Sequence, residues 1–125
     1  MIFGTGIDII EVERIKQSLE RAAPLHNKLF TQTEQEYCKN CKVAVYLCFA
    51  ARFAAKEAFF KALGTGYRYG MTFTEIEIKN DNLGKPFIET HGKVNDFLKK
   101  NNIVTVHLSI SHVKETAVAI VILEK

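Results

Sequence analysis

Polar and apolar residues alternate along the first part of the chain with the two-residue period of a β-strand. Residues 2–10 form this strand, in which Gly4, Gly6 and Asp8 share one face and the intervening side chains share the other. A helix is predicted to follow over residues 11–22, where apolar positions recur every three or four residues and acidic residues stand in the first turn. The chain therefore opens with a strand that leads directly into an amphipathic helix.

Two further helices are predicted from the residues at their ends. The segment from Thr31 to Glu34 has the Thr-x-x-Glu pattern of a capping box, which predicts that a short helix begins there. Residues 45–63 are rich in Ala, Leu and Lys and contain neither Gly nor Pro. They are followed by Gly64, and Gly is the residue type that most often ends a helix. The longest helix of the chain is therefore expected over residues 45–63.

The second half of the chain has the short alternating segments of an antiparallel sheet, with one more helix among them. Its predicted elements are strands at residues 74–79 and 86–90, a short amphipathic helix at 93–100, and strands at 104–111 and 116–123. No repeat, low-complexity tract or linker divides the chain. We therefore predict one α+β domain over residues 1–125, with helices packed on a mostly antiparallel sheet.

Composition and charge exclude several classes of protein. The 125 residues are 47% hydrophobic and 25% charged, which is typical of a globular chain and not of a disordered or fibrous one. The formal net charge of +3 is too small to indicate a nucleic-acid-binding protein by itself. The sequence shows neither a signal-peptide pattern nor an apolar stretch of about 20 residues that could span a membrane. We therefore expect a cytoplasmic protein without membrane association.

Three cysteines, Cys38, Cys41 and Cys48, lie close together in the sequence. An odd number of cysteines leaves one thiol over in any set of disulfides, and the Cys-x-x-Cys spacing of the first two has no second pair to complete a zinc site. A redox motif of the thioredoxin type should open a helix after a strand, whereas this pair falls near a helix end. We therefore interpret the cysteines as reduced thiols in a helix and its following loop.

Asp8 interrupts an otherwise apolar segment, where an unpaired carboxylate would be costly to bury. One interpretation is that Asp8 caps the helix that follows, since Asp is a favoured residue at helix N-termini. The other is that Asp8 is a metal ligand held at the end of a rigid strand. The segment by itself favours the cap.

Four charged residues of the long helix suggest a phosphate site. At about 100° per residue, Glu57 flanks an aromatic stripe, Lys61 follows one turn later and Lys56 falls within the stripe. Arg52 adds another cation to the same region. A solvated pair explains Glu57 and Lys61, but an ammonium within an aromatic stripe needs either an exposed tip or an anion. Two carboxylates, Asp8 and Glu57, beside several cations are typical of a Mg²⁺ site that binds substrate phosphates.

The segment Gly64-Thr65-Gly66 follows the long helix instead of preceding one. A phosphate loop of the Walker or Rossmann type needs a strand, then glycines, then a helix whose N-terminus faces the phosphate. The order here is reversed, so we interpret Gly64 as the end of the helix. The backbone N–H of Gly66 could still approach a ligand.

His107, Ser109 and Ser111 share one face of a predicted strand, and the alternation directs the next residue, His112, to the other face. Their hydroxyl and imidazole groups could bind phosphate or ribose oxygens, or they could cover a solvated sheet face. A serine hydrolase is not expected, because the chain has no Gly-x-Ser-x-Gly pattern.

Arg14 and Arg21 are seven residues apart on the first predicted helix, so they share one of its faces. This face lies opposite much of the apolar stripe of the helix. Most basic helix faces are simply solvated, but this one could also dock an acidic partner.

These segments together resemble the holo-[acyl-carrier-protein] synthases, the short type of 4′-phosphopantetheinyl transferase, nearly from end to end. The resemblance is carried by the segments Gly4–Arg14, Phe30–Glu34, Arg52–Lys61, Ala62–Gly66, Leu83–Pro86 and Ser109–His112. The first segment and the central one, Arg52–Lys61, are specific to the family. Their joint occurrence in so short a chain carries the resemblance.

The resemblance implies transfer of 4′-phosphopantetheine from coenzyme A to a serine hydroxyl of an apo-acyl carrier protein, with release of adenosine 3′,5′-bisphosphate, in fatty acid biosynthesis. It also implies Mg²⁺ as the cofactor and a homotrimer with active sites between subunits. From the residues alone, two alternatives stay open. One is a nucleotide-binding or nucleic-acid-binding domain without catalysis, and the other is a structural subunit whose charges are all solvated.

The resemblance also implies a role for each candidate residue. Asp8 and Glu57 would be the Mg²⁺ ligands, and Lys61 would stabilise charge on the coenzyme A pyrophosphate. A base, either Glu57 or a water on the metal, would assist the attack of the serine on the β-phosphate. The residues implied in binding the nucleotide and its phosphates are Arg52, Lys56, Lys61, Gly64, Thr65, Gly66, Ser109, Ser111 and His112. Those implied in binding the carrier protein are Arg14 and Arg21.

Overall fold

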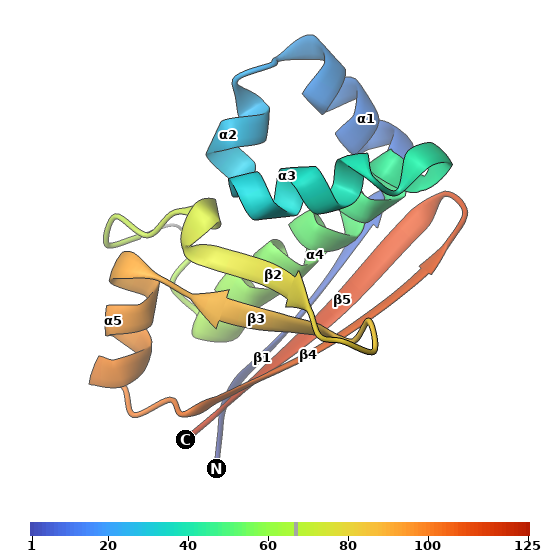
Figure 1. The fold of residues 1–125 in the computed structure, drawn as a ribbon. Helices are drawn as coiled ribbons and strands as arrows, with labels where there is room; N and C mark the ends of the chain where they lie inside the picture. The colour runs from blue at the N-terminus through green and yellow to red at the C-terminus, as the bar shows by residue number, and fades with distance from the viewer. Residues whose placement is uncertain (67) are drawn as a thin grey trace.

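The computed structural model describes residues 1–66 and 68–125, and it has the α+β architecture that the sequence predicts (Figure 1). Its elements in chain order are β1 (Ile2–Glu11), α1 (Val12–Arg21), α2 (Leu25–Leu29), α3 (Gln32–Lys39), the 3₁₀ turn η1 (Lys42–Ala44), α4 (Val45–Leu63), the 3₁₀ turn η2 (Phe73–Glu75), β2 (Ile76–Asn80), β3 (Pro86–Thr90), α5 (Gly92–Lys100), β4 (Thr105–Val113) and β5 (Thr116–Glu124). The helix α4 has the bounds that the sequence predicts, and Gly64 ends it with a left-handed backbone at φ 78°. In the described part of the chain, no helix is both long enough and apolar enough to cross a bilayer.

The strands form two antiparallel sheets instead of the single sheet expected from the sequence. A three-stranded sheet has the order β1-β5-β4, and β2 pairs with β3 in a separate hairpin. In Figure 1 the helix α4 runs between the long three-stranded sheet and the β2-β3 hairpin. Because α4 is enclosed in this way, it is buried around most of its circumference and not only along one aromatic stripe.

The strand β1 lies directly against α4 because two of its residues have no side chain. A Cβ atom on Gly4 would overlap the carbonyl oxygen of Ala62, and one on Gly6 would overlap that of Ala58. The strand face that carries these glycines also carries Asp8, so the close packing brings Asp8 against the second half of α4.

The other face of the three-stranded sheet is left uncovered by the described residues. In register across the sheet, Ile7 lies beside Ile120, and Ile9 lies beside Val118. The residues Ile7 and Ile9 are 59% and 66% exposed. Apolar residues gathered on an open sheet face, in contrast to single scattered ones, are typical of a surface that another protein chain covers.

Two local elements differ from the sequence-based expectations. The sequence does not predict the short helix α2, because its five residues are too few to show a helical period. The strand expected from residue 74 begins at Ile76, since Thr72 and Glu75 form a capping box around the turn η2. The capping box of Thr31 and Glu34 is present at the start of α3, as the sequence predicts.

Cys38 and Cys48 form a disulfide that ties α3 to the first turn of α4. Cys41 is free. The expectation of three reduced thiols is therefore wrong for two of them. The reason is tertiary, because the chain between α3 and α4 turns back and brings together residues that are ten positions apart.

Candidate functional site

Asp8 lies within β1, where it pairs with Ala119 of β5. The N-cap residue of α1 is Glu11, and no side chain caps that helix end. The cap interpretation that the local sequence favours is therefore wrong. One carboxylate oxygen of Asp8, Oδ2, is buried and has no hydrogen-bond partner among the residues that the structure describes. A buried carboxylate oxygen without a partner is costly, and a bound cation would satisfy it.

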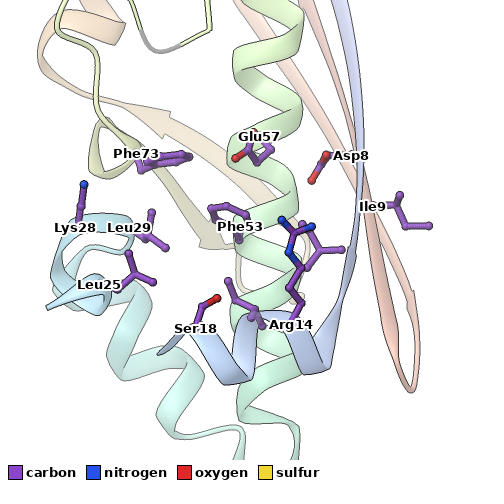
Figure 2. A pocket seen from close by; sticks show the side chains of 12 residues that line it. Asp8, Ile9, Arg14, Ser18, Leu25, Lys28, Leu29, Phe53, Glu57 and Phe73 are labelled. Carbon is purple, nitrogen blue, oxygen red and sulfur yellow. The ribbon is translucent and has the colours of Figure 1, made fainter. Parts of the chain in front are cut away.

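Asp8 and Glu57 line one open cavity of about 540 Å³, here called the carboxylate cavity, whose lining residues come from β1, α1, α2, α4 and η2. Figure 2 shows the two carboxylates near each other at one end of this space, Asp8 on the strand and Glu57 on the helix. Their pairing is a hypothesis at the level of sequence, because a strand and a helix far apart in the chain need not meet. The tertiary structure brings them to the same cavity.

Lys61 contacts Asp8, in addition to standing one helical turn beyond Glu57. Its Nζ donates a hydrogen bond to Asp8 Oδ1 at 3.0 Å and another to the carbonyl oxygen of Ile7 at 2.9 Å. The Lys61 side chain is 54% exposed, whereas that of Asp8 is 14% exposed. The ammonium thus stands on the solvent side of Asp8, where it is able to turn toward a ligand.

A second cavity of about 390 Å³, here called the loop cavity, shares Glu57 with the first one. Lys61, Gly64 and Gly66 also line it, and both glycines have positive φ angles. The Thr65 hydroxyl donates to the carbonyl oxygen of Gly66 at 3.2 Å. Because the glycines have no side chains, the backbone after α4 can approach a ligand closely at this point.

Four residues that the sequence did not single out also line the carboxylate cavity. Ser18 and Lys28 contribute polar groups, and Phe53 and Phe73 contribute aromatic rings. Ser18 follows Arg14 by one helical turn on α1, a spacing that could have pointed to it. Lys28 lies on α2, which the sequence does not predict, so no signal pointed to it.

Arg14 and Arg21 lie at different distances from the carboxylates. Arg14 lines the carboxylate cavity, and Figure 2 shows its guanidinium on the side of Asp8. Arg21 is the exposed last residue of α1 and does not line that cavity. Arg14 therefore lies at the carboxylate cavity, and Arg21 lies at the C-terminal end of α1.

Lys56 is fully buried and lines neither cavity. Its Nζ donates to Glu34 Oε1 at 2.8 Å and to the carbonyl oxygens of Phe73 and Ile76 at 2.9 and 2.7 Å. Burial lowers the pKa of the Lys56 ammonium, and the charge of Glu34 opposes that shift. The ammonium meets its anion inside the protein, so this geometry does not support the expectation that Lys56 lies near substrate phosphates.

Arg52 lies on another side of α4, away from Glu57. It lines a third cavity of about 320 Å³, here called the arginine cavity, together with His112 of β4. Its Nη2 donates to Asn80 Oδ1 at 2.7 Å, and its guanidinium lies 4.3 Å from the centre of the Tyr37 ring. Burial lowers the pKa of the Arg52 guanidinium. Arg52 is thus grouped with His112 and not with the two carboxylates.

Ser109 and Ser111 are exposed on the uncovered face of the three-stranded sheet, as alternation along the strand predicts. They lie beside Ile120 and Val118 of β5, in the same rows as the exposed isoleucines of β1. Within one chain, they do not line any of the three cavities. His112 lies on the opposite strand face, toward the arginine cavity.

One further group of possible metal ligands lies elsewhere in the described chain, at Glu77, Glu89 and His91. Lys79 forms ion pairs with both glutamates, and His91 Nε2 lies 3.0 Å from Glu77 Oε1. This group already holds a cation of its own, the Lys79 ammonium, so we do not interpret it as a metal site.

The sequence is similar to one family of proteins over almost its whole length. The family model of the 4′-phosphopantetheinyl transferase superfamily matches residues 4–121. The chain is 50% identical to a holo-[acyl-carrier-protein] synthase of Trichlorobacter lovleyi, over 99% of this chain and 98% of that protein. It is 46% identical to a protein of the same name from Geobacter metallireducens, over 100% of this chain and 99% of that protein.

Solved structures share the fold as well. A crystal structure of a holo-[acyl-carrier-protein] synthase from Neisseria meningitidis matches with a TM-score of 0.92 and 35% sequence identity, over 100% of both chains. A synthase from Bacillus anthracis, solved in complex with CoA (3′,5′-ADP), matches with a TM-score of 0.81 and 42% identity, over 98% of this chain and 96% of that one.

Proposed function

The chain belongs to the 4′-phosphopantetheinyl transferase superfamily, among the holo-[acyl-carrier-protein] synthases, and from this premise we propose how its residues carry out the reaction. The enzyme transfers 4′-phosphopantetheine from coenzyme A to a serine of apo-acyl carrier protein, a step of fatty acid biosynthesis that releases adenosine 3′,5′-bisphosphate. The observation that carries the assignment of residues is the cavity in which Asp8 and Glu57 meet beside Lys61.

Asp8 and Glu57 would hold a Mg²⁺ ion. Two observations support this fit, because both side chains line the carboxylate cavity and Asp8 Oδ2 is buried without a hydrogen-bond partner in the described part of the chain. Mg²⁺ is commonly bound by one or two carboxylates together with substrate phosphates and water. When bound, the ion would supply positive charge that offsets the charge of the coenzyme A pyrophosphate during transfer.

In the reaction, the serine oxygen of the carrier protein forms a bond to the β-phosphorus of coenzyme A. The bond from that phosphorus to the bridging oxygen breaks, and adenosine 3′,5′-bisphosphate leaves. We assign removal of the serine proton to Glu57, since this side chain lines both the carboxylate cavity and the loop cavity. Lys61 would turn from Asp8 to a pyrophosphate oxygen and stabilise the charge that grows on the leaving group.

The backbone after α4 would contact the same phosphates. Gly64 and Gly66 line the loop cavity beside Lys61, and Thr65 stands between them. Without side chains at the two glycines, backbone N–H groups can approach phosphate oxygens directly.

Arg52 and His112 would bind the 3′-phosphate of the nucleotide. They line the arginine cavity together, and contacts with Asn80 and Tyr37 orient the guanidinium of Arg52. A guanidinium held in a fixed orientation suits the planar, two-point recognition of a phosphate. We give Lys56 no contact with the substrate, because it pairs with Glu34 inside the core.

Each active site would contain residues from two copies of the chain. Arg52 and Glu57 are five residues apart on α4, which turns their side chains about 140° apart around the helix axis. One coenzyme A molecule is not expected to reach around a buried helix, so the arginine cavity would come from a neighbouring subunit. The uncovered sheet face with Ile7 and Ile9 would make the subunit contact, in a homotrimer. Ser109 and Ser111 lie on that same face and would stand near the shared site.

The helix α1 would dock the acidic carrier protein. Arg14 stands at the carboxylate cavity and Arg21 lies at the exposed end of the helix, so the two would lead the partner toward Glu57. Opposite charges on two surfaces raise the rate of encounter and fix the orientation of docking.

Transfer itself tests the assignment. Apo-acyl carrier protein is incubated with the enzyme, coenzyme A and Mg²⁺, and the mass of the carrier is followed. We expect a gain of one phosphopantetheine, which disappears when a chelator removes the metal. Glu57→Gln should abolish the gain in a folded protein, whereas Glu36→Gln, an exposed residue on α3, should retain it.

Two outcomes would count against these statements, and they are distinguishable. No mass gain with the unmodified enzyme would contradict the function. A normal rate of transfer by Glu57→Gln would leave the function intact and contradict the role of Glu57.

A further inference from the structure

The wall of the arginine cavity contains sulfur atoms to which the reaction assigns no role. Cys41 and Cys48 both line this cavity. Cys48 is bonded to Cys38, which is fully buried, whereas Cys41 is free and half-buried. The Cys-x-x-Cys pair of the sequence thus has one member in a disulfide and the other beside it in the same region of the fold.

The disulfide joins two elements that hold the guanidinium of Arg52. Arg52 Nη1 donates to Cys48 Sγ at 3.6 Å, one turn earlier on α4. The guanidinium also lies 4.3 Å from the ring centre of Tyr37, the residue that directly precedes Cys38 on α3. Breaking the Cys38–Cys48 bond removes the covalent link between the end of α3 that carries Tyr37 and the start of α4, while the Glu34–Lys56 ion pair still holds the other end of α3. The contact of Arg52 with Tyr37 crosses from α4 to α3, and its contact with Cys48 is made to a sulfur of the disulfide itself. The hydrogen bond to Asn80 involves neither α3 nor the disulfide.

We propose that the Cys38–Cys48 disulfide is a thiol-exchange site whose redox state sets how tightly Arg52 binds the 3′-phosphate of coenzyme A. The inference rests on the function proposed above and adds regulation to the same site. In the oxidised form, α3 and α4 are linked and Arg52 is oriented before the phosphate arrives, so binding costs less conformational entropy. In the reduced form, Arg52 and Tyr37 gain freedom, and the phosphate must order them when it binds.

The position of the two sulfurs defines the point of attack. Cys38 is fully buried and Cys48 lines the cavity, so the thiolate of a dithiol reductant would attack Cys48 Sγ. This step forms a mixed disulfide at Cys48 and releases the Cys38 thiolate, which takes up a proton. The second thiol of the reductant then displaces Cys48. The products are two cysteine thiols and one oxidised reductant, which has given up two electrons.

Binding of coenzyme A in the arginine cavity and thiol exchange at the Cys38–Cys48 disulfide should then affect each other. A nucleotide in the arginine cavity covers Cys48 and should slow attack by the reductant. By thermodynamic linkage, coenzyme A must also favour the redox form that binds it more tightly, which is the oxidised one. 3′-Dephospho-coenzyme A lacks the group that Arg52 would hold, so it should favour that form much less.

The test compares dissociation constants of coenzyme A and 3′-dephospho-coenzyme A for the oxidised and the dithiothreitol-reduced enzyme, by titration calorimetry. Thiol titration first establishes each redox state. We expect reduction to weaken binding of coenzyme A by about fivefold or more and to change binding of the dephosphorylated compound little. An equal change for both ligands, or no change for either, would overturn the inference. So would an enzyme that still titrates as three free thiols after treatment with oxidised dithiothreitol.

Two variants control the comparison. Cys38→Ala removes the disulfide from its buried end and should bind coenzyme A like the reduced enzyme under both conditions. Cys41→Ser keeps the disulfide and should keep the response to dithiothreitol. Transfer to carrier protein at saturating coenzyme A is measured alongside. If both redox forms transfer phosphopantetheine and bind coenzyme A with the same affinity, the redox inference alone is rejected. If neither form transfers phosphopantetheine, the proposed function is rejected as well.

Discussion

Lys61 Nζ lies 3.0 Å from Asp8 Oδ1, although 53 positions separate the two residues in the chain. The contact exists because Gly4 and Gly6 let β1 lie directly on α4. Lys61 satisfies one oxygen of the Asp8 carboxylate, and the other oxygen, Oδ2, has no partner in the described part of the protein. The Lys61 ammonium and a metal ion would therefore each contact one oxygen of the Asp8 carboxylate. When a substrate phosphate binds, Lys61 would be able to pair with the phosphate instead.

Lys61→Met should separate metal binding from catalysis. Without the ammonium, both oxygens of Asp8 face the cation, so Mn²⁺ should bind the coenzyme-free protein at least as tightly as it binds the unmodified one. Transfer should fall by about 100-fold or more, because the leaving group loses its countercharge. Electron paramagnetic resonance titration and carrier mass measure the two effects. Lys61→Arg should keep part of the activity, and weaker Mn²⁺ binding in Lys61→Met would contradict this arrangement.

Gly6→Ala should push β1 and α4 apart, because the added methyl group meets the carbonyl oxygen of Ala58. We expect the free energy of unfolding to fall by about 1–3 kcal/mol or more and Mn²⁺ affinity to fall with it. Urea denaturation and Mn²⁺ titration measure both. Gly84→Ala is the matched control, since its methyl group meets open space at a positive φ. It should cost about 1–2 kcal/mol and leave Mn²⁺ affinity unchanged.

Lys56→Met should destabilise the protein strongly, since it leaves the buried carboxylate of Glu34 without its cation. Breaking one half of a buried ion pair typically costs about 3–5 kcal/mol. The double variant with Glu34→Gln should lose less than the sum of the two single variants, because no charge is then left buried. Urea denaturation gives the four free energies of the cycle. Strictly additive losses would show that the two side chains do not stabilise each other.

Ile9→Glu should dissociate the proposed homotrimer, because it places a carboxylate on the uncovered apolar face of the sheet. Light scattering after size-exclusion chromatography measures the mass of the particle, and transfer should fall as the oligomer is lost. Leu83→Glu is the control, since Leu83 is 96% exposed in the β2-β3 turn and outside that face. An unchanged mass for Ile9→Glu would count against this interface.

Arg21→Glu should raise the KM for carrier protein severalfold and leave the KM for coenzyme A nearly unchanged, because Arg21 lies outside the carboxylate cavity. Arg14→Glu should affect both constants, since Arg14 lines that cavity. Steady-state kinetics with each substrate varied in turn measures these changes. Lys16→Glu makes the same charge change beside Tyr46 and is the control. An unchanged carrier KM in Arg21→Glu would argue against docking on α1.

Features set by local backbone preference could be predicted from the sequence. The bounds of α4 and its end at Gly64, the strand β3 and the capping box of Thr31 and Glu34 all depend on residues within a few positions of one another. Asp8, Glu57 and Lys61 are candidates from the local charge pattern as well as from the resemblance to a family, but the sequence left the pairing of the two carboxylates as an inference. For Asp8, the local pattern favoured a helix cap, which the structure contradicts.

Neighbours on one helix were the hardest to assign. Arg52, Lys56 and Glu57 lie within two turns of α4, and the sequence groups them in one phosphate site. In the structure, Glu57 faces the carboxylate cavity, Lys56 is enclosed with Glu34, and Arg52 lines the arginine cavity. On a helix that other elements surround on most sides, adjacent side chains contact different elements. Sequence spacing gives the direction of each side chain around the helix axis, but it does not tell which element lies in that direction.

The sequence alone determined which groups are available: the approximate positions of most strands and helices, which residues share a face, and the family to which the motifs are similar. The tertiary structure decided which of those groups meet, including the contact of Lys61 with Asp8, the pairing of Lys56 with Glu34 and the disulfide that replaces reduced thiols. The physical reason is one of range. Backbone conformation depends on adjacent residues, whereas burial, charge pairing and cavity walls depend on the close packing of elements that the chain itself holds far apart.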